Sequence, residues 1–578
     1  MSLMRGPRSL MAWLVRLIRL ARAPALAFGL AMGLALGLSA CGGGSTKGGS
    51  GTLATGTDAT HGALTLGLSG GAQREVEHVW VTIGSVALHS SATQAWSSSD
   101  RSWVVLNLPT PVVVDLAQTS QPNTSQSDVS RVLDGVSVPQ GSYAQMRLFP
   151  LAHDADLVDA ARNAGLGHNA QVRYTDATVG TQNMPLELPQ PAQGWRFEGA
   201  LNVVAGQSNY VVLQSDVQHN LVRLASSDGR ARFGWRSQMS GFDLTSSGAI
   251  FGYIDPARLC GGTGAAAAPN CASEVIASAQ RLSADGSRYE SVRAARVGTG
   301  GGFALYPLPS ASQFDVVITG RHMQTMVIRA VTVSAFNVLT TLDWSALGST
   351  TSPLTPVIVP GTEPGVSLSA AVVPGSGALR MGQTLAAAGK PHEVATQQRD
   401  PFTGRLAREL TVPAGPLSVA TFTSSGAALS FADETPVEGL QGFSAQAAGR
   451  SHDDDGAVAT VSAPAPGSLI AVPNPSLKAG VGTGLVNVTL TGALSPSYDQ
   501  AMVVVADVDG IVQTQSVSGA GSVSLAVPAG ANAAAHGGAL YSVAVRATGA
   551  SGTLRWVRAP ALVDLRAGGS VGVTLALP

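Results

Sequence analysis

Short alternating runs of apolar and polar residues are the feature that most restricts how this 578-residue chain can fold. Glycine, proline, asparagine or aspartate interrupts these runs every few positions. In YAQMRL at 143–148, the Ala, Met and Leu side chains would share one face of a strand, since successive residues of a strand alternate between its faces. Helical periodicity is nearly absent after residue 40, and we expect only one short helix, over Asp156–Ala164. The pattern predicts an all-β chain of serial β-sandwich domains.

The first forty residues have the pattern of an export signal. They contain five arginines and no acidic residue, and an apolar run covers Ala25–Leu38. This run is shorter than the roughly 20 residues that a membrane-spanning helix needs. Leu38-Ser39-Ala40-Cys41 resembles the lipobox of bacterial lipoproteins. The resemblance implies that the signal, residues 1–40, is cut before Cys41 and that Cys41 is acylated, so that the lipid bilayer becomes a partner. The alternative is an ordinary signal peptide with a chance cysteine.

Residues 41–60 after this cysteine are rich in glycine, serine and threonine. Such a composition buries no core and predicts a flexible tether between the lipid and the folded part. Gly42 stands where Gram-negative lipoproteins retained in the inner membrane commonly carry aspartate. We therefore expect an outer-membrane lipoprotein of the cell envelope.

The charge balance of the chain limits the classes of molecule that it is expected to bind. The chain without residues 1–40 carries 30 Lys and Arg against 36 Asp and Glu. This acidic balance disfavours nucleic acid, because proteins that bind it usually present a basic patch. No cofactor is expected.

Besides Cys41, the chain has only Cys260 and Cys271. They flank a loop without periodicity, and in an oxidising envelope they predict a disulfide that closes this loop. A metal site is the alternative, but no histidine or further cysteine lies nearby to complete it.

The first folded block, residues 61–247, opens with a strand-like run and continues with VEHVWVTIGSVALHS at 76–90, VLDG at 132–135, VPQGSYAQMRL at 138–148 and LQSD at 213–216. This order of segments resembles the family catalogued as domain of unknown function 4382, which follows lipoboxes in bacterial envelope proteins. The resemblance implies no known activity and no functional residue.

The second block, residues 248–346, contains GAIFGYI at 248–254, GFALYPLP at 302–309 and FDVVI at 314–318. This pattern resembles the carboxypeptidase regulatory-like, transthyretin-type sandwich, which is a non-catalytic module in its family. A Pro/Gly/Ser/Thr-rich linker follows at 347–365. Beyond it we expect a weaker β-domain, the third block, at 366–475 and a C-terminal β-sandwich, the fourth block, at 476–578.

Several segments match parts of catalytic or binding motifs. Gly67-Leu68-Ser69-Gly70-Gly71 fits G-x-S-x-G, but that nucleophile elbow joins a strand to a helix, and here we expect a turn between strands. His392-Glu393 begins the zinc motif H-E-x-x-H, but Thr396 replaces its second histidine, so we expect a surface loop. Gly298–Gly302 lacks the Lys-Ser/Thr of a phosphate-binding loop and is expected to be a loop that enters a strand.

The acidic segments His452–Gly456 and Asp507–Gly510 are expected to be turns. Closely spaced carboxylates can also bind Ca²⁺, although neither segment has the spacing of an EF-hand. The first block contains five tryptophans, which are interpreted as core residues or, alternatively, as a platform for sugar stacking: Trp80, Trp96, Trp103, Trp195 and Trp235.

Together these patterns predict an envelope lipoprotein that acts as a non-enzymatic binding or structural module. A glycan-binding or adhesion protein is the main alternative, and a hydrolase on a β-scaffold is a third. The candidate partners beyond the bilayer are an envelope polysaccharide or protein.

Overall fold

The computed structural model describes residues 53–578 apart from 74–75, 118–128, 177–178, 225–230, 256–274, 285, 299, 321–322, 335–339, 343–353, 355–364, 369–376, 385–389, 405, 407–409, 412–415, 435–439, 448–450, 453–455, 463–467, 471–476 and 550–552. Cys41, Cys260 and Cys271 lie outside these residues, so lipidation and the disulfide stay predictions. Within the described part, no helix is both long and apolar enough to cross a membrane.

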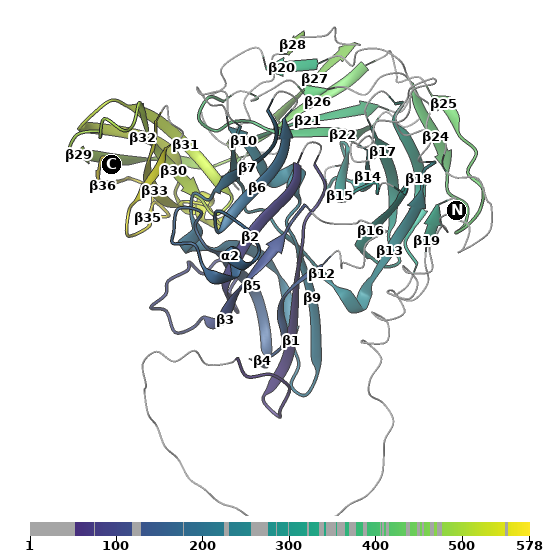
Figure 1. The fold of residues 1–578 in the computed structure, drawn as a ribbon, viewed down its shortest axis with the longest axis horizontal. Coiled ribbons are helices and arrows are strands. Elements are labelled where there is room, and N and C mark those ends of the chain that lie inside the picture. The colour runs from purple at the N-terminus through teal and green to yellow at the C-terminus, as the bar shows by residue number, and fades with distance from the viewer. Residues whose placement is uncertain are drawn as a thin grey trace, which may run out of the picture.

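The chain is built from β-sheets, which confirms the predicted fold class (Figure 1). The first block contains two of them. One sheet has the order β12-β9-β1-β4, formed by Ser240–Asp243, Ser208–Gln214, His61–Ser69 and Ser130–Pro139. Its central strand β1 pairs antiparallel with β4 and parallel with β9.

The second sheet of this block has the order β10-β11-β7-β6-β2-β5-β8, and β3 pairs with β2. Strand β2 spans Val76–His89, long enough to pair with β6 through its first half and with β5 through its second. The other strands are β3 (Val104–Asp115), β5 (Gly141–Pro150), β6 (Ala170–Asp176), β7 (Gly180–Glu187), β8 (Trp195–Val203), β10 (Leu221–Leu224) and β11 (Arg232–Trp235). One apolar core, which includes Leu64, Ile83 and Leu148, joins the two sheets.

Strand β5 is covered on both faces, although the alternation of its sequence predicts only one buried face. Met146 and Leu148 face the core, and Gln145 and Arg147 on the other face are buried as well. Gln145 donates hydrogen bonds to the carbonyls of residues 91, 92 and 94, and Arg147 donates to the carbonyl of Gln193. The segment between β2 and β3 therefore folds back over the sheet and satisfies Gln145, while the turn before β8 satisfies Arg147.

In the described residues of the first block, two short α-helices interrupt the strands. The predicted helix is present over Asp159–Asn163 as α2, shorter than expected. The second, α3 (Val217–Asn220), begins after the LQSD segment, where the Asp216 side chain accepts hydrogen bonds from the amides of Gln218 and His219. An aspartate in this position satisfies amides that the helix itself leaves without acceptors.

Residues 54–60, which the sequence assigns to the tether, lie along the edge of β4. The amide of Gly56 donates to the carbonyl of Gly135, and the amide of Ser137 donates to that of Ala54. This part of the segment is held by backbone hydrogen bonds to the first block.

The second block packs a three-stranded sheet, β16-β13-β19 (Gly302–Pro309, Ser247–Tyr253 and Thr340–Leu342), over part of a larger one. Strand β16 begins at Gly302, so the glycine-rich segment before it leads into a strand as predicted. In the larger sheet, β14 (Ile276–Leu282) pairs with β15 (Tyr289–Arg296) and β17 (Gln313–Thr319), and β18 (Met326–Thr332) follows.

The larger sheet continues into the third block. Its ten strands have the order β25-β24-β18-β17-β14-β15-β22-β21-β26-β27, and Figure 1 shows the teal strands of the second block beside the green strands of the third. The third-block strands are β21 (Gly377–Thr384), β22 (Pro391–Gln398), β24 (Leu417–Thr421), β25 (Ala432–Glu434), β26 (Leu440–Ala447) and β27 (Gly456–Ser462). A small sheet, β23-β20-β28, consists of Leu410–Thr411, Gly365–Leu368 and Ser468–Ile470.

The fourth block is a sandwich of two sheets around an apolar core. One has the order β32-β29-β36, formed by Gly521–Ala529, Gly482–Thr491 and Ser570–Ala576. The other has the order β31-β30-β33-β34, formed by Gly510–Val517, Gln500–Asp507, Leu540–Thr548 and Leu554–Arg558, and β35 (Val563–Asp564) pairs with β33. The short helix α4 (Ala531–Ala535) follows β32.

Candidate functional site at the contacts between blocks

The contact between the first and second blocks uses the segment that matches G-x-S-x-G. Ser69 ends β1 and is fully buried, and the next element is strand β2, as predicted for a turn between strands. Arg293 of β15 reaches it from the second block: its Nη1 lies 3.1 Å from the Ser69 hydroxyl and also donates to the carbonyl of Gly70. Ser69 therefore takes part in a buried contact between blocks.

Further contacts extend this junction. Arg296 of β15 donates to the carbonyls of Gln73 and Val76 at 2.6 Å each. Ala72 packs against Ile276 and Ala294 in a small apolar cluster. Two arginines of one strand thus satisfy carbonyl groups at the end of β1 and the start of β2.

The second contact involves His392 and Glu393, for which the prediction of a surface loop was wrong. Both side chains lie on strand β22 and are less than a tenth exposed. His392 Nε2 is 2.8 Å from Asp315 Oδ2, and its ring stacks on Tyr289 with ring centres 4.1 Å apart. The polar residues are buried because each has a partner on a neighbouring element, which a linear motif does not show.

Glu393 faces the first block, since neighbouring residues of a strand point to opposite sides. Its carboxylate is 2.9 Å from His219 Nε2 and accepts a hydrogen bond from Thr396 Oγ1 at 2.5 Å. Close by, Arg236 of the first block donates to Gln398 Oε1 at 2.8 Å. His392 and Glu393 therefore link the third block to the second and first blocks, and Thr396 hydrogen-bonds to the Glu393 carboxylate within β22.

The third contact joins the first and fourth blocks through two ion pairs. Arg546 of β33 donates from Nε and Nη2 to the two carboxylate oxygens of Glu187, at 2.7 Å each. The Arg546 and Glu187 side chains are 7% and 3% exposed. Arg558 of β34 lies 3.0 Å from Asp154. Figure 1 shows the fourth block, in yellow, beside β6, β7 and β10.

The environment of these carboxylates sets their pKa values. Burial by itself would raise the pKa of Glu187, but the charge and hydrogen bonds of Arg546 outweigh it and hold the pKa below its ordinary value. The pKa of Asp154 is lowered in the same way, with the Arg558 hydrogen bond and charge prevailing over burial. Both groups therefore stay ionised at neutral pH.

The acidic turn Asp507–Gly510 is inserted into this contact. Strands β30 and β31 pair antiparallel through Asp507 and Gly510, which confirms the predicted hairpin turn. Gln190 donates to the carbonyl of Asp507, and the Ser237 hydroxyl donates to that of Val508. In the described residues no three His, Cys, Asp or Glu side chains are grouped as a metal site, and residues 453–455 of the other acidic turn lie outside them.

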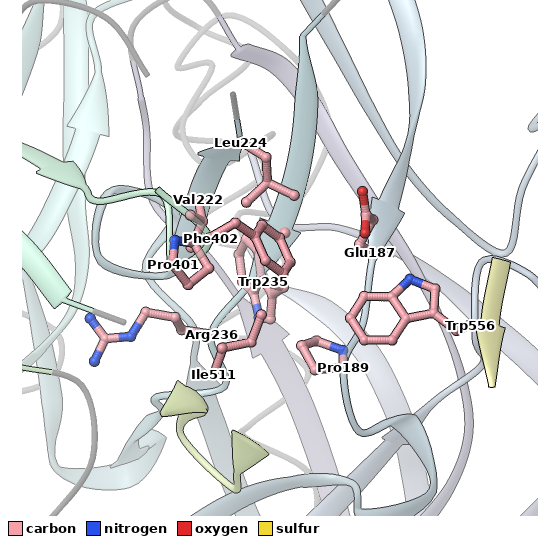
Figure 2. A pocket seen from close by; sticks show the side chains of 11 residues that line it. Glu187, Pro189, Val222, Leu224, Trp235, Arg236, Pro401, Phe402, Ile511 and Trp556 are labelled. Carbon is pink, nitrogen blue, oxygen red and sulfur yellow. The ribbon is translucent and has the colours of Figure 1, made fainter. Parts of the chain in front are cut away.

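A small cavity of about 20 Å³ lies where the first, third and fourth blocks meet (Figure 2). Aromatic rings from all three blocks line it: Trp235, Phe402 and Trp556. Asp400 accepts hydrogen bonds from the Phe402 amide and the Thr403 hydroxyl, and this turn places the Phe402 ring 4.5 Å from the Arg546 guanidinium. The cavity is therefore a gap between the three blocks that is lined mainly by apolar side chains.

The five tryptophans of the first block differ in exposure. Trp103, Trp195 and Trp235 are buried, and Trp96 packs on Trp103 with ring centres 5.1 Å apart. Trp80 is half-buried on β2 and stacks on His78, with ring centres 4.5 Å apart and the rings nearly parallel. Asp115 accepts from Val79 N and Ala117 N and lies 2.5 Å from His78 Nδ1, so it fixes this stack.

Sequence reasoning missed Glu187, Arg546 and His153, a buried residue of the loop after β5. The available signal is a charged residue inside an apolar strand, as in YSVAVRAT around Arg546 and SVRAARV around Arg293. Such residues are rarely buried without a partner. The pattern predicts that a partner exists, but it does not say which residue it is.

A comparison with known families supports the first block's assignment. The model of the family described as domain of unknown function (DUF4382) matches residues 61–232, which confirms the resemblance seen in the sequence. No curated protein matches the chain. The carboxypeptidase regulatory-like assignment of the second block stays a prediction.

Solved structures with partial similarity are β-rich bacterial proteins. The Bacillus anthracis TIE protein is 9% identical, with 91% of this chain and 75% of that one covered and a TM-score of 0.16. A streptococcal ancillary pilin is 8% identical, with 57% and 99% covered and a TM-score of 0.16. The Bacillus cereus major pilin subunit BcpA is 11% identical, with 57% and 99% covered and a TM-score of 0.11. TM-scores this low do not establish a common arrangement of domains.

Proposed function

We propose that this chain, whose first block matches the DUF4382 family model over residues 61–232, is an envelope lipoprotein that serves as a non-enzymatic structural and binding module. The bilayer partner is reached through acylated Cys41, and the site of action is the outer membrane. The lipobox-like Leu38–Cys41 and the Gly/Ser/Thr-rich residues that follow support the anchor.

The observation that carries the structural role is the use of buried polar side chains between blocks. Ser69 pairs with Arg293, Glu393 with His219, and Glu187 with Arg546. Each pair links the first block to a different one, so the first block is the hub on which the others dock. A chain whose buried charged side chains form contacts between blocks is suited to keep a fixed arrangement of these blocks at the end of a tether.

The anchor is tested with the full chain and Cys41→Ser, with the Cys260→Ser and Cys271→Ser double variant as the matched cysteine control. Membrane fractionation should find the wild type and the control in the membrane and Cys41→Ser released. Protease shaving of intact cells then distinguishes a surface-facing protein from a periplasmic one. If Cys41→Ser and the wild type fractionate alike, the anchor is refuted.

The alternative function, glycan binding or adhesion, rests on the stack of Trp80 and His78. A half-buried indole held in place by an Asp115-bound imidazole is a rigid aromatic surface of the kind that stacks on sugar rings. Tryptophan fluorescence is measured during titration with envelope polysaccharide. Binding that survives in Val105→Ala, an exposed position on the neighbouring β3, and is lost in Trp80→Ala would support it. Equal responses in both variants would refute it.

A further inference from the structure

His153 is a buried residue of the first block, next to Asp154, whose carboxylate pairs with Arg558 of the fourth block. It lies in the loop after β5 and is 5% exposed. Neither ring nitrogen has a hydrogen-bond partner among the residues that the structure describes. A buried imidazole with no acceptor within reach is stable in its neutral form, because burial penalises the charged form.

Charged groups surround this imidazole from several elements. Asp154, the next residue, is paired with Arg558 of β34, and Glu187 of β7 is paired with Arg546 of β33. Five further charged or titratable groups belong to the same region: Arg232, half-buried His168, Arg236, and the buried Asp507 and Asp509 of the inserted turn.

Glu187 and Asp154, the two carboxylates whose charges act on His153, already have arginine partners. Protonated His153 would add a positive charge to this region, with Arg558 opposing it and Glu187 and Asp154 favouring it. Burial is the largest effect and lowers the pKa of His153 below its ordinary value. The position therefore combines a buried titratable ring, a place beside an interblock ion pair and an absence of hydrogen-bond partners among the described residues.

We propose that His153 makes docking of the fourth block on the first sensitive to pH. The docked arrangement holds the neutral imidazole. Acidification favours a separated arrangement in which water solvates the imidazolium. The surface that becomes accessible on separation includes Trp235 of the first block and Trp556 of the fourth, which line the cavity between them.

The direction of the effect follows from proton linkage. Separation returns the pKa of His153 toward its ordinary value of 6.5, so separation takes up a proton. The contribution of neutral His153 to the free energy of docking is therefore present in full above about pH 6.5, and it declines as the pH falls below this value. Asp154 and Glu187 contribute in the same direction only below their ordinary pKa values of 3.8 and 4.5, so they do not act between pH 5.0 and 7.5.

Hydrogen exchange of the full chain measures this docking. Central amides of the fourth block exchange when that block opens as a unit, so their protection includes the free energy of docking. Peptides from β30 and β33 report it, and peptides from β14 and β17 of the second block are the internal reference. Rates are corrected for the intrinsic effect of pH. Each unit by which docking lowers the pKa corresponds to roughly a tenfold change in the docking equilibrium.

We expect exchange in β30 and β33 to accelerate severalfold relative to β14 and β17 when the wild type passes from pH 7.5 to 5.0. His153→Gln and His153→Leu, whose side chains are neutral at every pH, should both remove this acceleration. Two substitutions are compared so that the test still holds if one variant misfolds. His168→Gln, at a half-buried histidine of the same region, should keep it. A constant ratio in the wild type, or an unchanged pH response in both His153 variants, would overturn the proposal.

Discussion

Removing Arg546 should release the fourth block from the first. In Arg546→Met, the Glu187 carboxylate keeps its burial and loses both 2.7 Å hydrogen bonds together with its opposite charge. Methionine retains much of the length and the apolar stem of arginine, so packing against Phe402 is largely preserved. The change therefore isolates the charge.

The expected cost follows from the burial of both partners. Removing one member of a buried ion pair typically costs about 3–5 kcal/mol, because a charge stays buried without compensation. Replacing both members with apolar groups is often close to neutral, so Glu187→Leu with Arg546→Met should recover most of the loss. Without the arginine, burial raises the pKa of Glu187, so the loss should be smaller at pH 5 than at pH 8.

The assay is again hydrogen exchange in β30 and β33, where a loss of 3–5 kcal/mol corresponds to exchange faster by roughly two to three and a half orders of magnitude. The control is Arg566→Met. Its partner Asp564 lies in the same block, and both side chains are nearly half exposed, so the expected cost is about 0–1 kcal/mol. Equal effects of Arg546→Met and Arg566→Met, or a double variant no better than the single one, would refute the assigned role of the pair.

Three further predictions concern individual contacts. Gly70→Ala should lower the free energy of unfolding of the first block by about 1–3 kcal/mol in thermal unfolding, because the new Cβ would lie 1.9 Å from the Leu116 carbonyl oxygen. In the control Gly572→Ala, the new Cβ meets no atom within 4 Å, so stability should be nearly unchanged. Tyr541→Phe should destabilise the fourth block by about 1–2 kcal/mol in denaturant unfolding, since the buried hydroxyl donates to the Pro528 carbonyl; an unchanged midpoint would contradict this. Glu393→Gln should speed hydrogen exchange in β22 by roughly tenfold or more, because the carboxylate contacts both His219 and Thr396. The control Thr421→Ala, at an exposed position on β24 of the same sheet, should change the exchange rate in β22 little. Equal effects of the two variants would count against the contact of Glu393 with His219.

Local pattern was sufficient for the strands and turns. The alternation in YAQMRL and the turn at Asp507–Gly510 both act within a few residues, so the sequence predicts them directly. The helix that Asp216 caps was not predicted. The same local logic failed at His392 and Glu393. The incomplete zinc motif led to the expectation of an exposed loop, while the partners of these two residues, Asp315 and His219, are 77 and 174 positions away.

The sequence alone thus determined an all-β chain, its first-block family and the positions of most strands, because side-chain alternation is a property of each strand. The tertiary structure decided which polar side chains are buried between blocks. Glu187 and Arg546 are 359 positions apart, and no periodicity relates residues at such separation. Only the docking of folded sheets brings these charges together, and their burial at the junction makes the arrangement of the blocks depend on a few ion pairs and one imidazole.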